Sequence, residues 1–254
     1  MNEKSSEYVK APEIMKLSAS AIKTYEQCPK KYFFNYKQKA PKKQWDHFDL
    51  GNVCHKTLEL FHLAYLKEGT TKRTLGKIMS ASFETARKSF PNLGDILASE
   101  AKDMLMGYLQ TAKQNGMPLV KGCETSFDFK LKDNVLIRGV VDRIDVLKDG
   151  RFRIIDYKTT KNVKYLDEFQ LSVYGLWLKE KYPHVEEFNG AYVLLKHNSK
   201  LKEYTFNTED IEKARKNLID CADKIMIENV WTPIPTALCN WCDFKEICPA
   251  HQSW

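Results

Sequence analysis

The chain of 254 residues lacks any long hydrophobic run. Its longest stretch without a charged residue, residues 229–242, has two prolines and spans 14 residues, whereas a membrane-spanning helix needs about 20 apolar residues. The first 16 residues are polar and have no apolar segment of the kind found in secretory signals. These absences argue against a membrane or secreted protein, so we expect no membrane partner and a cytoplasmic location.

Cysteines are few, and their number does not suit a disulfide framework. The chain has seven, an odd number without a secretory signal. Four are isolated (Cys28, Cys54, Cys123 and Cys221), and three form a C-x2-C-x5-C cluster (Cys239, Cys242 and Cys248). Clustered thiols in a reducing compartment bind a metal more often than they pair with each other. The C-terminal cluster therefore predicts a metal site.

The composition is that of an ordered globular protein, with 43% apolar and 12% aromatic residues. Its 40 Lys and Arg exceed its 33 Asp and Glu by seven, an excess that permits binding to nucleic acid without requiring it. One segment interleaves basic residues with aromatic ones: Lys30, Lys31, Lys37, Lys39, Lys42 and Lys43 with Tyr32, Phe33, Phe34, Tyr36 and Trp45. Two interpretations stay open, a solvated helix face over an aromatic core and a strand-binding surface.

Helical periodicity dominates the first half of the chain, after a polar lead-in over residues 1–16. Ser18 is a suitable N-cap for a helix that runs to about residue 37, with Pro29 as its weak point. Further helices are predicted over residues 51–66, 71–90 and 95–114, the last two separated by a helix-breaking run at 91–94.

After residue 118 the pattern changes to that of strands. A meander is predicted over residues 119–131, 135–147 and 151–157, with turn sequences at 132–134 and 148–150. A helix over 166–181, strands over 190–196 and 202–206, and a last helix capped by Thr208 and ending near 228 follow. The sequence therefore predicts a single α/β domain over residues 1–254: a mainly helical part (17–118), an α/β core (119–230) and an irregular tail (231–254).

Acidic and basic side chains gather at the ends of two predicted strands. Asp142 and Asp145 lie on one strand in the pattern G-x-x-D-x-x-D, and Asp156 and Lys158 end the next. Because Asp156 and Lys158 are two residues apart, we expect both on one face of the strand. Carboxylates among apolar neighbours are costly to bury unpaired, and a bound Mg²⁺ or Mn²⁺ would offset that cost. The alternative is that these are ordinary residues of strand ends.

Three more side chains belong to this prediction. Gln170 and Tyr174 share one face of the following helix, where Gln170 could bond to a phosphate and Tyr174 could stack on a base. The alternative for Tyr174 is a core aromatic residue. His55, at the start of a predicted helix, is either a structural histidine or a nitrogen ligand that shifts the metal preference toward Mn²⁺.

This set of residues resembles the PD-(D/E)XK nucleases, specifically the RecB-like branch with the nuclease domains of RecB and AddB and the exonucleases of CRISPR adaptation. Residues 17–33 are similar to the first helix of that branch. The resemblance implies a restriction-endonuclease-like mixed sheet flanked by helices, and a metal-dependent DNA exonuclease active on single strands or duplex ends. This sequence differs from the PD-(D/E)XK pattern at Val141, which stands in place of the proline. Asp156 is the second acidic residue of the pattern.

By the same resemblance, each of these side chains has an expected role. His55, Asp142, Asp156 and the carbonyl of Tyr157 would bind the metal, Lys158 would be the catalytic lysine, and Gln170 and Tyr174 form the Q-x-x-x-Y motif. Glu124 matches an acidic position on the preceding strand. The main alternative is a DNA-binding or assembly module with a decayed nuclease site.

The resemblance also implies a [4Fe–4S] cluster bound by Cys28, Cys239, Cys242 and Cys248. Zinc on these four cysteines, or with His251 in place of Cys28, is the alternative. The remaining cysteines, Cys54, Cys123 and Cys221, are expected as buried apolar residues. Because no G-x-x-x-x-G-K-[ST] motif is present, a separate helicase or recombinase would have to supply any ATP-driven step.

Overall fold

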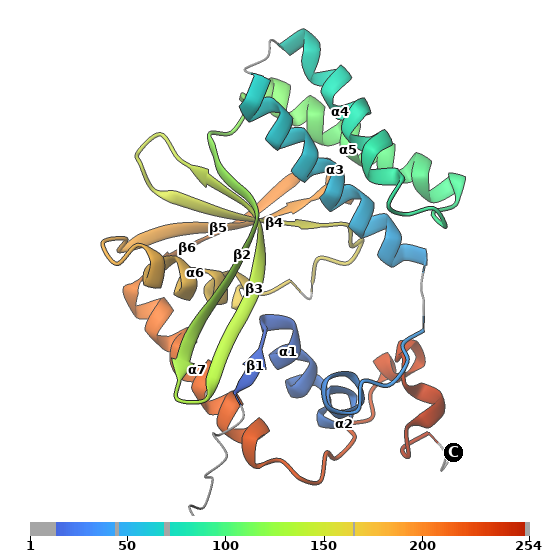
Figure 1. Ribbon diagram of the computed structural model, residues 1–254, viewed down its shortest axis with the longest axis vertical. Coiled ribbons are helices and arrows are strands. Elements are labelled where there is room, and N and C mark those ends of the chain that lie inside the picture. The colour runs from blue at the N-terminus through green and yellow to red at the C-terminus, as the bar shows by residue number, and fades with distance from the viewer. Residues whose placement is uncertain (1–13, 44–45, 69–71, 165, 252–254) are drawn as a thin grey trace, which may run out of the picture.

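One mixed sheet of six strands forms the centre of the molecule (Figure 1). The structure is a computed structural model that describes residues 14–43, 46–68, 72–164 and 166–251. The strands are β1 (Met15–Leu17), β2 (Val120–Lys132), β3 (Val135–Val146), β4 (Phe152–Lys158), β5 (Glu187–Leu194) and β6 (Lys200–Asn207). They are ordered β1-β3-β4-β5-β6, and β2 also pairs with β3.

The predicted meander is confirmed, since β2, β3 and β4 pair antiparallel in chain order. Asn134 and Gly150 adopt positive φ angles in the two turns, as their residue types favour. β4 and β5 are parallel and therefore need a crossover, which α6 (Phe169–Lys181) provides. β1 was not predicted, because a strand of three residues is too short to show alternation; it pairs parallel with the start of β3.

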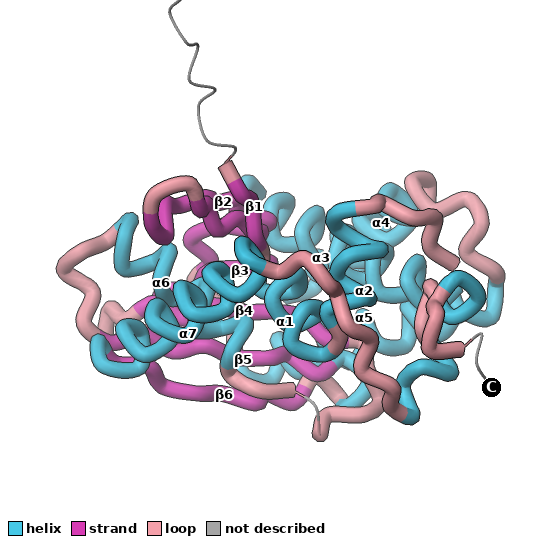
Figure 2. The backbone as a smooth tube through the Cα atoms, turned by 90° about the horizontal axis from the view of Figure 1, so that it is seen from below, coloured by secondary structure: helices cyan, strands magenta, loops and turns pink. Residues whose placement is uncertain are grey.

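Helices cover both faces of the sheet (Figures 1 and 2). On one face, α3 (Asp46–Glu68), α4 (Lys72–Arg87) and α5 (Asp95–Asn115) share a core with Ile155 and Tyr157 of β4. On the other face, α1 (Ala19–Gln27), α6 and α7 (Thr208–Ile227) pack against Ile154 and Tyr192. The expected architecture, a mixed sheet flanked by helices, is thus confirmed. Among the residues that the structure describes, no helix has the length and apolarity needed to cross a membrane.

Several predicted boundaries were wrong: the helix predicted from residue 51 begins at Asp46, for example, and three further differences have local reasons. Pro29 ends the first helix early: α1 stops at Gln27, and α2 (Pro29–Tyr32) and a π-helical turn (Phe33–Lys37) follow separately. Asn207, not Thr208, caps α7, because its side chain and that of Asp210 bond reciprocally to each other's backbone N–H. The strand predicted over 190–196 is β5, which begins earlier, at Glu187, and ends at Leu194, before a 3₁₀ turn.

The C-terminal tail, residues 231–251, lies beside α1 and α2 (Figure 1). Trp231 stacks on the buried ring of Tyr32 with centroids 5.7 Å apart, and Phe244 packs on Phe34 at 5.5 Å. These aromatic residues of the basic segment therefore hold the tail, which favours the core interpretation over strand binding for them. Trp45 lies outside the described residues.

Candidate active site

The site forms where β3 and β4 part from each other. Their backbone pairing ends at Arg143 and Ile155, so Asp142 and Asp156 are the next residues beyond the ladder. The Oδ2 atom of Asp142 accepts a hydrogen bond from the backbone N–H of Tyr157 at 2.7 Å. A carboxylate thus takes the place of a backbone acceptor, and it bridges the two strands at the point where a gap opens between them.

Asp156 and Lys158 lie on the same face of β4, with Lys158 Nζ 2.6 Å from Asp156 Oδ1. Lys158 also donates to Gln170 Oε1 at 3.1 Å, and Gln170 Nε2 donates to the Tyr174 hydroxyl at 2.6 Å. That hydroxyl donates to Asp156 Oδ2 at 3.4 Å, which closes a ring of four side chains. We call these four residues the carboxylate–lysine ring. It fixes the ammonium group of Lys158 from two sides.

Tyr174 is buried, with 6% of its surface exposed, and its ring lies against Phe127. A base cannot stack on a ring that is covered in this way, so the expectation of base stacking by Tyr174 is wrong for this arrangement. Its hydroxyl group and Gln170 instead position Lys158 and Asp156. Gly175 supports this packing, because a Cβ atom there would overlap with the ring of Phe188 on β5.

Beside the ring, three side chains from three elements converge. His55 of α3, Glu124 of β2 and Asp142 of β3 each offer one ligand atom, and these atoms lie within 4.8 Å of one another. His55 Nδ1 is 3.3 Å from Asp142 Oδ2. Burial by itself lowers the pKa of His55, but the hydrogen bond and the charges of Asp142, Asp156 and Glu124 outweigh it and raise the pKa above its usual value.

Nearby positive charge only partly compensates the negative charges of the carboxylates at this site. Burial, and then the charge of Asp142, raise the pKa of Asp156 to about 6 despite the nearby Lys158. The same two causes raise the pKa of Glu124 to about 7. Burial and crowding of like charges penalise the ionised form, and a divalent cation would relieve both. The donor set of one imidazole and several carboxylates fits Mn²⁺ or Mg²⁺.

In the metal-free protein, the contribution of these carboxyl groups to stability should therefore fall as the pH rises. Glu124 binds its proton more tightly when folded, so its contribution falls between its unfolded pKa near 4.5 and its folded value of about 7. In EDTA, Glu124→Gln should match the wild type in melting temperature at pH 4, below the unfolded pKa, and exceed it at pH 8. At pH 8 we expect the free energy of unfolding of the variant to exceed that of the wild type by about 1–2 kcal/mol. This figure is smaller than the full pKa shift implies, because Glu124 is partly exposed to solvent. Equal melting curves at both pH values would contradict this.

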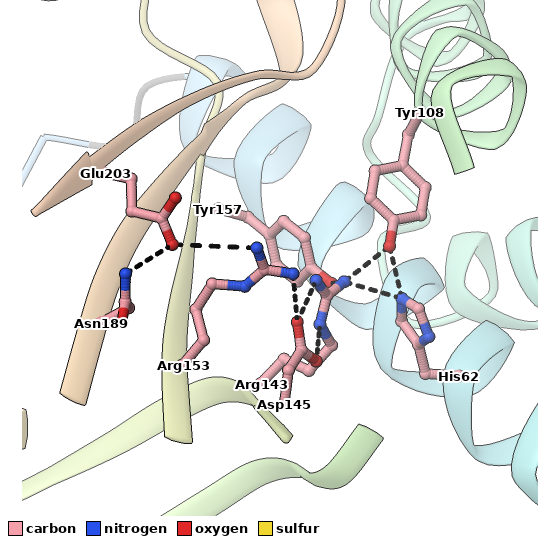
Figure 3. Close-up of polar contacts among 8 residues, drawn as sticks. All are labelled: His62, Tyr108, Arg143, Asp145, Arg153, Tyr157, Asn189 and Glu203. Atoms are coloured by element: carbon pink, nitrogen blue, oxygen red, sulfur yellow. Dashed lines mark hydrogen bonds and ion pairs between the residues drawn. The ribbon is translucent and has the colours of Figure 1, made fainter. Parts of the chain in front are cut away.

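Asp145 does not join this site, although the sequence grouped it with Asp142. Its carboxylate accepts two hydrogen bonds from Arg143, at 2.8 and 3.0 Å, in a separate buried cluster (Figure 3). The two aspartates are three residues apart on a strand, and this odd spacing turns them to different sides.

The four cysteines expected at a metal cluster line one pocket, together with His251. Cys28 lies between α1 and α2, and its Sγ atom accepts backbone N–H groups of Lys31 at 3.4 Å and Ile234 at 3.5 Å. Cys239 Sγ accepts the N–H of Thr236 at 3.3 Å. The break at Pro29 thus brings Cys28 to the tail. Of the other cysteines, Cys54 and Cys221 are buried as expected, and Cys123 is partly buried.

The chain is similar to proteins whose names indicate nucleases. The chain is 26% identical, over 215 residues, to one component of the ATP-dependent helicase/deoxyribonuclease of Streptococcus pyogenes serotype M1, and equally to the same component from strain NZ131 (serotype M49). Each match covers 77% of this chain, which spans about one fifth (20%) of the length of these relatives.

A crystal structure described as a candidate exonuclease from Eubacterium rectale shares the fold. Its TM-score is 0.53 at 13% identity, over 95% of this chain and 92% of that one. The model of the PD-(D/E)XK nuclease superfamily matches residues 16–249, which include every side chain of the site described above. The chain therefore belongs to the PD-(D/E)XK nuclease superfamily.

Proposed function

We propose that this chain is a metal-dependent DNA exonuclease that hydrolyses phosphodiester bonds of single strands or duplex ends. The observation that carries the proposal is the convergence of His55, Glu124 and Asp142 beside the carboxylate–lysine ring. The names of the relatives, helicase/deoxyribonuclease components and a candidate exonuclease, support DNA as the substrate and an exonuclease as the type.

His55, Asp142 and Asp156 would hold Mn²⁺ or Mg²⁺, with the carbonyl of Tyr157 as a further ligand. Glu124 joins this set because its carboxylate lies with His55 and Asp142. A divalent ion in such a site lowers the pKa of bound water and stabilises charge on a phosphate. Its positive charge would also keep Asp156 and Glu124 ionised, against the burial that favours their neutral forms.

Lys158 would act as the catalytic lysine. Gln170 and Asp156 hold its Nζ atom, so the ammonium group needs no reorganisation to orient water or to stabilise charge that develops on the phosphate. Tyr174 acts one step further away, because it fixes Gln170 and the second oxygen of Asp156. Gln170 and Tyr174 are thus positioning residues in this proposal.

For the cysteines we propose a [4Fe–4S] cluster. Each of the four irons of such a cluster takes one thiolate, and the four cysteines of the pocket would supply four. The backbone N–H groups that bond to the Sγ atoms of Cys28 and Cys239 suit charged thiolate ligands. Zinc bound by the same thiolates is the alternative.

We also propose that a separate helicase or recombinase acts with this nuclease. The relatives that it matches are named as components of a helicase/deoxyribonuclease, and this chain corresponds to about one fifth (20%) of their length. Unwinding of a duplex requires ATP, and the chain has no P-loop sequence of its own.

End-labelled single- and double-stranded DNA, incubated with Mn²⁺, with Mg²⁺ or with EDTA, tests the proposed function. We expect progressive shortening with either metal and intact DNA in EDTA. A covalently closed single-stranded circle should survive, because it has no end. Cleavage of the circle at the rate of linear DNA would overturn the exonuclease assignment, and no metal-dependent cleavage of any substrate would favour the decayed-site alternative.

A further inference from the structure

Figure 3 shows a second cluster of polar side chains, around Arg143. One of its members on β4 is Tyr157, which stands between Asp156 and Lys158 and therefore faces the opposite side of the strand. At the centre of the cluster is Arg143, 4% exposed, which pairs with Asp145 and contacts the hydroxyl groups of Tyr108 and Tyr157, both at 2.6 Å. Arg143 also donates to His62 Nε2 at 3.0 Å. The donors of this guanidinium are therefore well satisfied, and the metal site uses none of these side chains.

Next to this cluster is a pocket of about 520 Å³, between the C-terminal end of α5, the turn that joins β3 to β4, and the start of β6. Its volume falls in the range of small-molecule sites, about 300–1,000 Å³. Met117, Leu119 and Leu201 supply apolar wall, and Arg143 and Arg153 supply polar wall. Apolar walls with a few convergent polar groups are typical of binding sites for small organic molecules.

The charge on the pocket wall is positive. Arg143, Arg153 and Lys148 line it, against the single acidic residue Asp145. Both oxygens of Asp145 are already bonded to Arg143, and Oδ2 is also 3.4 Å from Arg153. Glu203 approaches Arg153 only to 3.8 Å and is partly exposed. Counting Glu203 as well, one positive charge remains, so the pocket favours an anion.

Two buried polar atoms of the wall have no hydrogen-bond partner within the part of the chain that the structure describes. They are Arg153 Nε and Ser199 Oγ. A buried polar atom that is left without a hydrogen-bond partner destabilises the fold. Ser199 is 4% exposed, and both it and Asn198 have positive φ angles, 55° and 53°. These two residues form the turn that leads into β6, where positive φ angles are common.

We propose that this pocket binds a small organic anion, with a phosphate or carboxylate group on an apolar body. The anionic group would pair with Arg153, Lys148 and the hydroxyl group of Ser199. The apolar body would cover Met117 and Leu119, which an inorganic ion would leave exposed.

The pocket adjoins the strands that carry the nuclease site. Arg143 follows Asp142 directly on β3, and Tyr157 lies between Asp156 and Lys158 on β4. A ligand that changes the contacts of Arg143 would therefore act on both strands. The binding site itself does not depend on the proposed nuclease activity, because none of its residues holds the metal.

Calorimetric titration of the full chain in EDTA tests the proposal, with deoxyadenosine monophosphate and benzoate as probes. Two compounds serve as controls: deoxyadenosine, which lacks the anionic group, and inorganic phosphate, which lacks the organic part. We expect saturable binding of at least one organic anion, at least tenfold tighter than either control. Binding of the nucleotide alone assigns a phosphate ligand, and binding of benzoate alone assigns a carboxylate. No binding of either probe at millimolar concentration would overturn the proposal.

Variants locate the bound probe. Arg153→Gln and, as a smaller change, Ser199→Ala should each weaken binding, the former by tenfold or more. Arg151→Gln is the matched control, since Arg151 lies two residues before Arg153 but does not line the pocket. This variant should change the affinity for the probe by no more than twofold. Asp156→Asn should bind as the wild type does. If Asp156→Asn abolishes binding, or if both pocket variants bind normally, the probe is elsewhere and the proposal fails.

Discussion

Asp156→Asn is expected to reduce DNA cleavage by roughly 10³-fold, because it removes the charge that both the metal and Lys158 require. Asp156 Oδ1 lies 2.6 Å from Lys158 Nζ, and its pKa, raised to about 6, marks it as a carboxylate that is costly to ionise without a cation. The amide keeps the shape of the side chain and needs no such cation. We therefore expect the variant to fold with at least the stability of the metal-free wild type.

A DNA-binding assay distinguishes a variant that has lost catalysis from one that no longer binds the substrate. By fluorescence anisotropy with labelled single-stranded DNA, Asp156→Asn should bind as well as the wild type or slightly better, because one negative charge is removed. Lys158→Met should also lose cleavage. Asp149→Asn, at an exposed turn, is the matched control and should cleave normally. The enzyme interpretation fails if Asp156→Asn cleaves DNA at the wild-type rate.

The sequence could predict those parts of the site that depend on local periodicity. The two-residue period of a strand places Asp156 and Lys158 on one face, and the helical period places Gln170 and Tyr174 together; the structure shows both pairs in contact. What periodicity cannot show is that the two pairs join into one ring. That contact depends on how α6 packs on β4 and β5.

Glu124 illustrates a limit set by register. Counting back from the turn, Lys132 pairs with Val135, and a regular ladder would not bring Glu124 opposite Asp142. An irregularity between Lys130 and Lys132 shifts the pairing by one residue, so that Thr125 pairs with Val141 and Cys123 with Arg143. Glu124 lies between these two pairs, and its carboxylate comes close to that of Asp142. A shift of one residue changes which side chains lie opposite each other, and the sequence of β2 does not indicate such a shift.

The Arg143 cluster illustrates a limit set by distance along the chain. Its members come from α3, α5, β3 and β4, and His62 and Tyr108 carry no local signal that would connect them with Arg143. Such contacts arise only once the helices are packed on the sheet. The sequence could therefore supply the candidates for the nuclease site, but not the second pocket.

Cys239→Ser is expected to remove the proposed cluster and to release the tail from the N-terminal helices. A four-thiolate cluster would link Cys28 to Cys239 across most of the chain. In the loop-closure view, such a link is worth up to about 5 kcal/mol through the entropy of the unfolded state. The aromatic contacts of Trp231 and Phe244 would hold part of the tail after the link is lost, so the measured loss of stability should be smaller.

Three measurements check this expectation. The wild type should be brown and contain iron and sulfide, whereas Cys239→Ser should be colourless, melt at a lower temperature and be cut faster by protease within residues 231–251. Cys123→Ser is the matched control, because Cys123 does not line the cysteine pocket. A colourless wild type that contains one zinc per chain would contradict the iron–sulfur proposal.

The same variant shows whether the cysteines have a structural or a functional role. α1 packs against α6, and Lys23 of α1 pairs with Asp167, just before α6, at 2.7 Å. Since α6 carries Gln170 and Tyr174, a loosened N-terminal segment should weaken the hold on Lys158 and lower cleavage together with stability. A structural link therefore predicts that activity and melting temperature fall together. If Cys239→Ser abolishes cleavage while its melting temperature is unchanged, the cysteine site is itself a functional centre.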